Sequence, residues 1–536
     1  MMTLNTFRFC LLTSVMLFLA GTGCCTNSSV SNQQEAAANL PPVTRPPETF
    51  FEIVREQDRE AARRFYGKYI SVMGIPVLAS AEVDDAALQR THWLVTHLLA
   101  GRPDISQAMS SNGMYLIIIG KDQVYTDMPE YRNNPNPDYM NERVRGTGGR
   151  PTSFGEENLL CLPLDRYDDE SIGLHEFCHT IDGTLRAMDP TWNQRKNAAY
   201  RNAMDKGLWR NAYASSNAGE YWAEICQSYF DCNRVNNWNH NHIGTREQLE
   251  AYDPVGYELV RSTFKLTGTN DWRYSFLRKQ PSVIAPPAKF RIDPYYTKFS
   301  WAREFPVVSR GASDEAILHA NDTIRKMFAY RHDVLKALIA EDLKLVVLGR
   351  REKLSDLPEF SRLKAAGVSG DSRKVDYVPD AKVIVVAEES ILQGRGKAAG
   401  EECEVIRQMA RAAYFSTCLR PVDPNWNNRG RNVQQYELRV TRLDERFDAK
   451  LKELHSSAKA KNLWRGMPAA EDRVEYLTAG VLAYFDAGNR NGKDGKPAVA
   501  TRETLRDYDP DLYELVHETM AYEGRQEWRY SAAKRK

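Results

Sequence analysis

The chain has 536 residues, of which 42% are hydrophobic and 27% are charged, and its 72 Lys and Arg residues balance 71 Asp and Glu residues. This length exceeds the size at which a single core stops growing, so more than one domain is expected. The composition is that of a folded protein and excludes disordered, collagen-like and polytopic membrane proteins. A formal net charge of +1 also argues against a broad basic face, so no nucleic-acid partner is expected.

The first 25 residues have the pattern of an export signal. A short basic region precedes an apolar run at residues 9–20, which is too short to span a bilayer. The following Thr22-Gly23-Cys24 resembles the bacterial lipobox, in which an acylated cysteine becomes the mature N-terminus, and Cys25 is a second candidate. We predict an exported protein of the cell envelope, held at a membrane surface only by lipid on Cys24, or otherwise secreted; an uncleaved anchor is the alternative.

Residues 26–48 are rich in Ser, Asn, Gln, Ala and Pro and lack apolar periodicity, which predicts a flexible linker. The remainder of the chain contains six cysteines but no CxxC pair, so a zinc site built from cysteines is not expected. The sequence does not decide between disulfides and buried free thiols for these six cysteines. They are Cys161, Cys178, Cys226, Cys232, Cys403 and Cys418.

Short motifs recur in the same order in two parts of the chain. Met128-Pro129-Glu130-Tyr131 returns as Leu357-Pro358-Glu359-Phe360, and Trp272-Arg273-Tyr274-Ser275 returns as Trp528-Arg529-Tyr530-Ser531. The spacing between copies grows mainly between Asn427 and Leu463, which indicates an insertion in the second copy. Two homologous domains are therefore expected, at residues 49–280 and 291–536, joined by the Pro-rich linker 281–290.

Each copy combines short β-branched runs with longer helical patterns. Strands are expected at residues 116–120 and 159–164 of the first copy and at 345–349 and 382–387 of the second. Amphipathic helices are expected in the first copy, for example at residues 86–100 and 249–265. The fold class is therefore α+β, with a mixed sheet in each copy. Neither copy has a nucleotide-binding fingerprint.

The strongest local motif is His175-Glu176-Phe177-Cys178-His179, an HExxH sequence preceded by acidic residues typical of a helix N-terminus. On a helix, positions i and i+4 share a face, so His175 and His179 can bind one Zn²⁺. Glu176 lies beside them and can take a proton from a metal-bound water. The alternative is a helix carrying two unrelated histidines.

A catalytic zinc site needs a third protein ligand and an open position for water. The sequence EYWAEICQSYF, which begins at Glu220, has an apolar pattern suited to packing on the HExxH helix. We assign Glu220 to the metal. Glu224 lies one turn later on the same face, where it would accept the free N–H of a ligating imidazole and fix its tautomer. For either acid, a solvated helix face is the alternative.

These segments resemble the catalytic domain of anthrax lethal factor and its relatives, zinc metallopeptidases of the gluzincin group. The resemblance rests on HEFCHTID (175–182), on NAGEYWAEICQSYF (217–230) and on Tyr213, which precedes Glu220 by seven residues (220 − 213). It implies a zincin-like fold, zinc bound by His175, His179 and Glu220, Glu176 as the general base, and Tyr213 as a hydrogen-bond donor to the oxyanion or leaving group.

Three other residues near these motifs are rival candidates for metal ligands. Asp182, three residues after His179, is an acid at a place where some zincins bind metal, but on a continuing helix it is better suited to supporting the site. His240 and His242 lie in an Asn-rich stretch and are expected to be solvated loop residues.

The second copy lacks the HExxH motif. Alignment from Asp423-Pro424 takes His175 to Met409, Glu176 to Ala410 and His179 to Ala413, whereas Glu220 corresponds to Glu475 and Tyr213 to Pro468. A single glutamate cannot hold a catalytic zinc ion. The second domain is therefore predicted to be a scaffold without a metal site, with binding of a protein partner as one possible role.

Together these features predict a zinc-dependent endopeptidase with one Zn²⁺ in the first domain. A peptide or protein substrate is favoured because a strand beside the site, assigned to residues 159–164, would pair with an extended substrate backbone. Cleavage of the chain itself or of one dedicated envelope protein is a variant of this prediction. The alternative from another class is a non-catalytic surface lipoprotein that uses both domains for binding.

Overall fold

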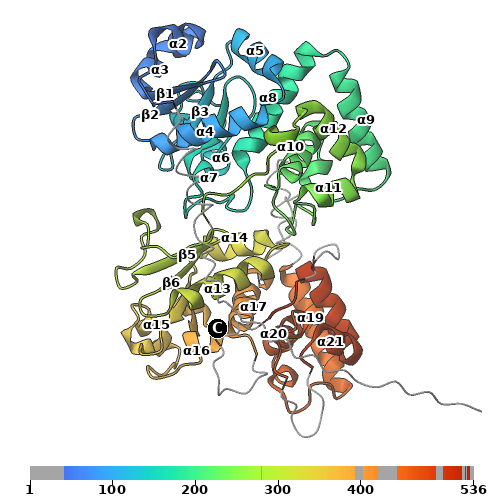
Figure 1. Cartoon of the computed structure of the whole chain (residues 1–536). Helices are drawn as coiled ribbons and strands as arrows, with labels where there is room; N and C mark the ends of the chain where they lie inside the picture. Colours follow the sequence, from blue (N-terminus) through green and yellow to red (C-terminus); the bar gives the residue numbers. More distant parts are fainter. Residues whose placement is uncertain are drawn as a thin grey trace, which may run out of the picture. The chain divides into compact units, whose positions relative to one another are not determined.

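The computed structural model describes residues 41–278, 280–392, 402–419, 443–490, 499–521, 526 and 528–531, and within it the residues from Val43 onward form one compact unit. The expected export signal, the lipidation site Cys24 and most of the linker 26–48 lie outside the described residues, as do residues 428–442 of the interval that is expected to hold the insertion. The described chain is α+β, with two four-stranded mixed sheets and many helices (Figure 1).

The first sheet has the strand order β1-β2-β3-β4. Strands β1 and β2 form an antiparallel hairpin, and β3 and β4 add to it in parallel. The strands of the N-terminal half (residues 43–280) are β1 (Tyr66–Val72), β2 (Ile75–Ser80), β3 (Leu116–Ile119) and β4 (Thr152–Gly155). Its helices are α2 (Glu48–Ile53), α3 (Arg59–Phe65), α4 (Asp85–Leu98), α5 (Pro103–Ser111), α6 (Pro137–Arg143), α7 (Glu156–Leu159), α8 (Ile172–Met188), α9 (Trp192–Asp205), α10 (Ala218–Tyr229), α11 (Arg246–Tyr252) and α12 (Pro254–Phe264).

Both faces of this sheet are covered, which explains why β3 is apolar at every position. Leu116 and Ile118 point into a core that also contains Phe177 of α8 and Trp222 of α10. The alternate residues of β3 pack on the opposite face, with the aromatic residues of α2 and β1. Burial of each such side chain contributes about 1.5–3 kcal/mol. The core thereby holds α8 and α10 against the sheet and against each other.

The strand expected at residues 159–164 is wrong, because the fourth strand is β4, directly before it. The chain leaves the sheet at Glu156, whose buried carboxylate accepts hydrogen bonds from the backbone N–H groups of Asp84 and Lys121, both at 2.8 Å. The following leucines pack into the core from α7 and a turn. The apolar run at 159–164 thus marks buried positions but not extended backbone.

The helix expected at residues 86–100 is α4, and the one expected at 249–265 is divided into α11 and α12. The division falls at Asp253, where Pro254 begins the second helix. Proline has no N–H to continue α11 and is well suited to the first position of α12.

The second sheet repeats the first, with order β5-β6-β7-β8 and the same pattern of one antiparallel and two parallel pairs. The strands are β5 (Lys298–Ala302), β6 (Phe305–Ser309), β7 (Leu345–Leu348) and β8 (Ile384–Ala387). The helices of the C-terminal half (residues 291–536) are α13 (Asp314–Met327), α14 (His332–Ala340), α15 (Phe360–Ala365), α16 (Glu388–Ile391), α17 (Glu404–Ala413), α19 (Glu445–Ala460), α20 (Arg473–Tyr484), α21 (Arg502–Tyr508) and α22 (Pro510–Val516).

Buried polar contacts are duplicated as well. In the N-terminal half, the indole Nε1 of Trp209 and the hydroxyl of Tyr221 donate to Asp253 Oδ2 at 2.9 and 2.7 Å. In the C-terminal half, the corresponding donors to Asp509 Oδ2 are Trp464 and Tyr476, both at 2.8 Å. Such contacts require matching side chains at three separate places in the chain. They support the internal duplication that the repeated motifs predict.

The six cysteines of the described chain are buried free thiols. The Pro-rich segment 281–290 is attached to the second sheet, because Ile284 forms a bridge with Phe299. Among the described residues, no helix has the combined length and apolar character needed to cross a membrane.

Candidate metal centre

Helices α8 and α10 pack directly against each other and supply the candidate ligands. Helix α8 begins after Ser171, whose hydroxyl accepts from the backbone N–H of Leu174. Helix α10 begins after Asn217, whose side chain accepts from the N–H groups of Gly219 and Glu220. These are standard N-terminal caps. The cap of α10 fixes Glu220 in its first turn, where the helix dipole favours a carboxylate.

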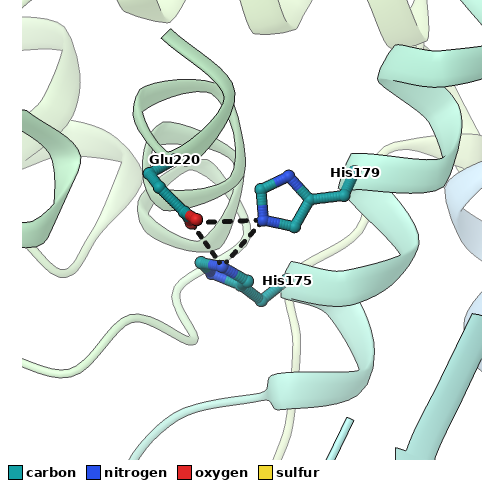
Figure 2. A group of neighbouring side chains, drawn as sticks. All are labelled: His175, His179 and Glu220. Atoms are coloured by element: carbon teal, nitrogen blue, oxygen red, sulfur yellow. Dashed lines mark hydrogen bonds and ion pairs between the residues drawn. The ribbon is translucent and has the colours of Figure 1, made fainter. Parts of the chain in front are cut away.

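The side chains of His175, His179 and Glu220 converge on one point (Figure 2). Glu220 Oε2 lies 3.2 Å from His175 Nε2 and 3.2 Å from His179 Nε2, and the two imidazole nitrogens are 3.1 Å apart. The structure therefore brings together the three residues that the sequence assigns to the metal. In the described part of the chain, no other three His, Cys, Asp or Glu side chains make such a group.

This triangle fits zinc. Ligand atoms about 2.1 Å from a tetrahedral Zn²⁺ are about 3.4 Å from one another, close to the separations seen here. Two imidazole nitrogens and one carboxylate oxygen are donors that zinc favours, and three protein ligands leave a fourth position open. The donor set and its dimensions therefore fit a zinc ion with one open position.

The electrostatics of the triad also favour a cation. Burial lowers the pKa of His175, but its contact with Glu220 and the charges of Glu176 and Glu224 outweigh burial and raise that pKa well above its ordinary value. Burial raises the pKa of Glu220, but His175 and His179 outweigh it and bring the pKa far below its ordinary value. The carboxylate of Glu220 thus lies between two imidazoles, with the charges of Glu176 and Glu224 acting on His175 as well, which is a favourable position for a divalent cation.

Gln227 is the residue that orients His175, and the sequence analysis missed it. Its amide oxygen lies 2.8 Å from His175 Nδ1, and its amide nitrogen donates to the carbonyl of Ser171 at 3.1 Å. Because an amide oxygen only accepts, this hydrogen bond places a proton on His175 Nδ1 and leaves Nε2 as the nitrogen that can bind a metal. The signal was present in the sequence, since Gln227 lies seven residues after Glu220 on the same helix face.

Glu224 was expected to accept this N–H, but its Oε1 is 3.7 Å from His175 Nδ1, beyond hydrogen-bond range. The same oxygen is 3.4 Å from His240 Nε2. Burial raises the pKa of Glu224, while the charge of His240 lowers it below its ordinary value. Glu224 therefore adds negative charge near His175 and contacts His240, whereas Gln227 makes the hydrogen bond.

The expectation of a solvated His240 is wrong, because this side chain is buried in a turn that faces the metal centre. Its Nδ1 is 3.0 Å from Asn237 Oδ1 and 2.9 Å from Asn239 Oδ1. The asparagines around it thus hold the ring in place. His242 is exposed, as expected.

Asp182 does not support the metal ligands. Its Oδ1 accepts from Trp192 Nε1 at 2.7 Å and from Lys196 Nζ at 2.6 Å, and its Oδ2 is 3.0 Å from Arg186. Asp182 lies two turns along α8 from His175, where its partners on α8 and α9 join these two helices. Asp182 is therefore a buried structural anion and is excluded as a ligand.

Glu176 and Tyr213 line the same cavity as His175, with a volume of about 330 Å³. Tyr213 precedes α10 in a short turn, and its ring centre is 6.3 Å from that of His175. Burial and then the Glu220 and Glu224 charges raise the pKa of Tyr213, so its hydroxyl stays protonated at neutral pH. The structure thus places an acid on α8 and a phenol donor beside the triad.

A glycine segment lies directly against α8. A Cβ atom on Gly148 would come within 2.5 Å of His179 Cβ, and one on Gly146 would come within 3.1 Å of Glu176 Cγ. Between them, Thr147 pairs with Ser153 of β4. Glycine at these positions therefore allows the chain to cover the helix that carries the HExxH motif, which the sequence analysis did not anticipate.

The C-terminal half has a different group at the equivalent place. The backbone N–H of Ser171 donates to the carbonyl of Cys232 at 3.1 Å, and that of Cys403 donates to Ala487 at 2.9 Å. The first residues of β4 and β8 are 232 positions apart in the sequence (384 − 152), and so are Ser171 and Cys403 (403 − 171). Cys403 therefore takes the place of Ser171 at the start of the helix.

This equivalence corrects the alignment made from sequence. His175 corresponds to Arg407 and His179 to Arg411, not to Met409 and Ala413, and Glu176 corresponds to Gln408. Both guanidinium groups contact Glu475, the counterpart of Glu220, with Arg407 Nη2 2.9 Å from Glu475 Oε2. The error arose because the anchor at Asp423-Pro424 follows the helix, in a part of the chain with a different local offset.

No protein-family model matches the chain, and no curated protein matches its sequence. Among solved structures, it is similar to the PRO-PRO endopeptidase PPEP-2 from Paenibacillus alvei, with 16% identity over 35% of this chain and 96% of that chain. The TM-score of 0.26 is too low to carry an argument about fold or function. The function of this chain has to be inferred from the geometry of its metal centre.

Proposed function

We propose that this chain is a zinc-dependent metalloendopeptidase of the gluzincin, lethal factor-like type, with its active site in the domain at residues 49–280. The supporting observation is the convergence of His175 Nε2, His179 Nε2 and Glu220 Oε2 within 3.1–3.2 Å of one another. A bound Zn²⁺ supplies Lewis acidity to a substrate carbonyl and lowers the pKa of a coordinated water.

Glu176 is the proposed general base. It follows His175 on α8 and lines the cavity next to the triad, so its carboxylate can accept a proton from water and transfer it to the leaving amine. Tyr213 is the proposed hydrogen-bond donor to the developing oxyanion, since its hydroxyl stays protonated at neutral pH. Gln227 holds His175 in the tautomer that leaves Nε2 available.

The test combines metal analysis with peptide cleavage by the purified chain from residue 26 onward. We expect about one zinc ion per chain and cleavage that Glu176→Gln abolishes without loss of zinc. Gln408→Glu, the reverse change at the equivalent position, is the matched control and leaves cleavage unchanged. A stable wild-type protein without zinc, or equal cleavage by Glu176→Gln, would refute the peptidase and favour a binding lipoprotein.

We also propose that the protein acts in the cell envelope, attached through lipid on Cys24. The support is the lipobox-like Thr22-Gly23-Cys24 after the apolar run. Cys24→Ala should move the protein from the membrane fraction to the soluble fraction, whereas Cys25→Ala should not. Membrane association that survives Cys24→Ala would contradict the anchor but not the peptidase.

A further inference from the structure

The cavity beside the metal centre is lined by both halves of the described chain. The N-terminal half contributes His175, Glu176 and Tyr213, together with Arg166. The C-terminal half contributes a second wall from the β5–β6 turn, from the segment between α13 and α14, and from α14 itself. Its lining residues are Arg303, Glu304, Phe328, Ala329, His332 and Lys336.

Ion pairs hold this wall next to the start of α8. Asp168 accepts from Arg325 at 2.9 Å, and Asp169 lies 2.5 Å from Arg303, both arginines of the C-terminal half. Arg234 of the N-terminal half also contacts Asp169 at 2.5 Å. Carboxylates that each bind more than one guanidinium group fix the geometry of the groups that they join. The second wall is therefore a defined part of the cavity.

The charges on the cavity side of this wall are not balanced. Arg166 Nη2 lies 3.3 Å from Glu304 Oε1, and Lys336 Nζ contacts Glu304 Oε2, so two cations share one carboxylate. Glu304 is mostly buried, with its side chain 11% exposed. Burial, and then the Arg166 charge, lower the pKa of Lys336 to about 8, although the Glu142 charge raises it. Positive charge is in excess at this place.

The surroundings of His332 show the same excess of positive charge. Its Nε2 is buried, lies 4.0 Å from Glu304 Oε2 and has no hydrogen-bond partner among the described residues. Burial lowers the pKa of His332 to about 3, with further lowering by the charges of Arg303 and Arg234. The imidazole is therefore neutral at physiological pH, next to fixed cations that an anion would stabilise.

We propose that Arg166 and Lys336 bind the carboxylate of an acidic residue of the substrate, close to the scissile bond. A second carboxylate would give each of the two cations its own partner inside the cavity that holds the catalytic residues. The C-terminal half, whose described residues include no such metal-binding group, then acts as the specificity wall of the N-terminal active site. This inference rests on the proposed peptidase function and names its substrate class.

The probe is a set of peptide libraries, acetylated and amidated at their ends, in which one fixed position is Glu, Gln or Lys and the others are mixed. The zinc-loaded chain should cleave the Glu library at least about tenfold faster than the Gln library, with the Glu at a constant distance from the cut. A parallel Gln library with a free C-terminus distinguishes a side-chain carboxylate from a terminal one. If only the library with a free C-terminus were cleaved faster than the blocked Gln library, the proposed binding of a side-chain carboxylate would be overturned.

The variants are Arg166→Gln and Lys336→Gln. Each should reduce the preference for Glu over Gln to less than about threefold while cleavage of the Gln library persists. Lys336→Glu should reverse the preference toward the Lys library. Lys326→Gln is the matched control, because Lys326 pairs with Asp322 on the surface and does not line the cavity. Thermal unfolding of each variant shows whether the fold is retained.

Binding separates this inference from the proposed function. Fluorescence anisotropy with the Glu176→Gln protein measures whether labelled peptides from the Glu library bind more tightly than those from the Gln library. Cleavage without a preference for Glu would overturn the acidic subsite and leave the peptidase intact. Tighter binding of Glu peptides that Lys336→Gln abolishes, without any cleavage by wild type, would support the subsite and refute the peptidase. Equal binding in the absence of cleavage would overturn both.

Discussion

The two halves of the chain share one frame of strands and helices but carry different side chains at its centre. In the N-terminal half, α8 presents two imidazoles to Glu220 of α10, whereas in the C-terminal half α17 presents two guanidinium groups to Glu475 of α20. The sheet order and the buried aspartates are unchanged. The frame is therefore specified without the metal ligands, and the ligands can be exchanged for fixed charges.

The replacement of the two histidines by arginines also explains how the buried carboxylate of Glu475 gains its counter-charge. Arg407, Arg411 and Glu475 have side chains only 12–14% exposed, so a lone Glu475 would be a costly buried anion. Two arginines neutralise it and occupy the space that a metal would take. Arginine stays charged at any physiological pH and cannot act as a zinc ligand.

The largest effect is expected when the first centre is converted into the second. The double change His175→Arg and His179→Arg removes two of three ligands but leaves each carboxylate with a partner. Zinc should be lost completely, with a fall in peptide cleavage of at least about 10³-fold. Zinc content and unfolding temperature are measured together. Retained zinc would show that Glu220 and these histidines are not the ligands.

The reverse conversion sharpens the comparison. Arg407→His with Arg411→His should create a second site at Glu475, so the zinc content should rise from about one to about two ions per chain. No additional cleavage is expected, because Gln408 stands at the position of Glu176. Unchanged zinc content in a folded double variant would contradict the structural equivalence of the two helices.

The buried aspartates should respond equally in the two halves. Asp253→Ala leaves the buried donors of Trp209 and Tyr221 without an acceptor, and we expect destabilisation by about 2–4 kcal/mol. Asp509→Ala does the same for Trp464 and Tyr476. Hydrogen exchange should show loss of protection in α10 for the first variant and in α20 for the second. A large effect of only one variant would mean that the two frames are not energetically equivalent.

A smaller effect is expected from the hydrogen bond that only the first centre has. Gln227→Leu introduces the residue found at the equivalent position, Leu482, and removes the acceptor for His175 Nδ1. Zinc affinity, measured by competition with a chelator, should fall about 10- to 100-fold. Gln227→Glu keeps an acceptor and should retain most of the affinity. Leu482→Gln is the control in the other half and should leave zinc affinity unchanged.

The sequence predicted the three residues that converge at the candidate metal centre because the pattern that identifies them is local. HExxH places two imidazoles on one helix face, and the apolar pattern after Glu220 identifies the helix that packs on it. The fold class and the duplication also followed from short patterns. The failures at residues 159–164 and at His240 have one cause, since buried contacts from distant segments decide whether an apolar run is extended and whether a loop histidine is solvated. The cavity wall around Lys336 depends on tertiary contacts in the same way.

The last difference between the halves concerns a buried glutamate of the repeated motif. Glu130 accepts from the hydroxyls of Tyr66 at 2.5 Å and Tyr115 at 2.9 Å, and burial outweighs these bonds and raises its pKa. Its counterpart Glu359 accepts from a tyrosine at 2.5 Å but pairs with Lys344 at 2.8 Å in place of the second phenol. Burial opposes ionisation there too, yet the hydrogen bonds from Lys344 and Tyr296 lower the pKa of Glu359.

The two glutamates should therefore give pH effects of opposite sign. A raised carboxyl pKa stabilises the fold below the unfolded-state pKa of about 4.3, and this contribution is lost as pH rises through the folded-state value. A lowered pKa stabilises the fold above about 4.3, and this contribution is lost as pH falls through the folded-state value. Glu130→Gln should thus cost most at acidic pH and Glu359→Gln most at neutral pH, as measured by unfolding free energies between these conditions. The same sign for both variants would mean that Lys344 does not set the difference.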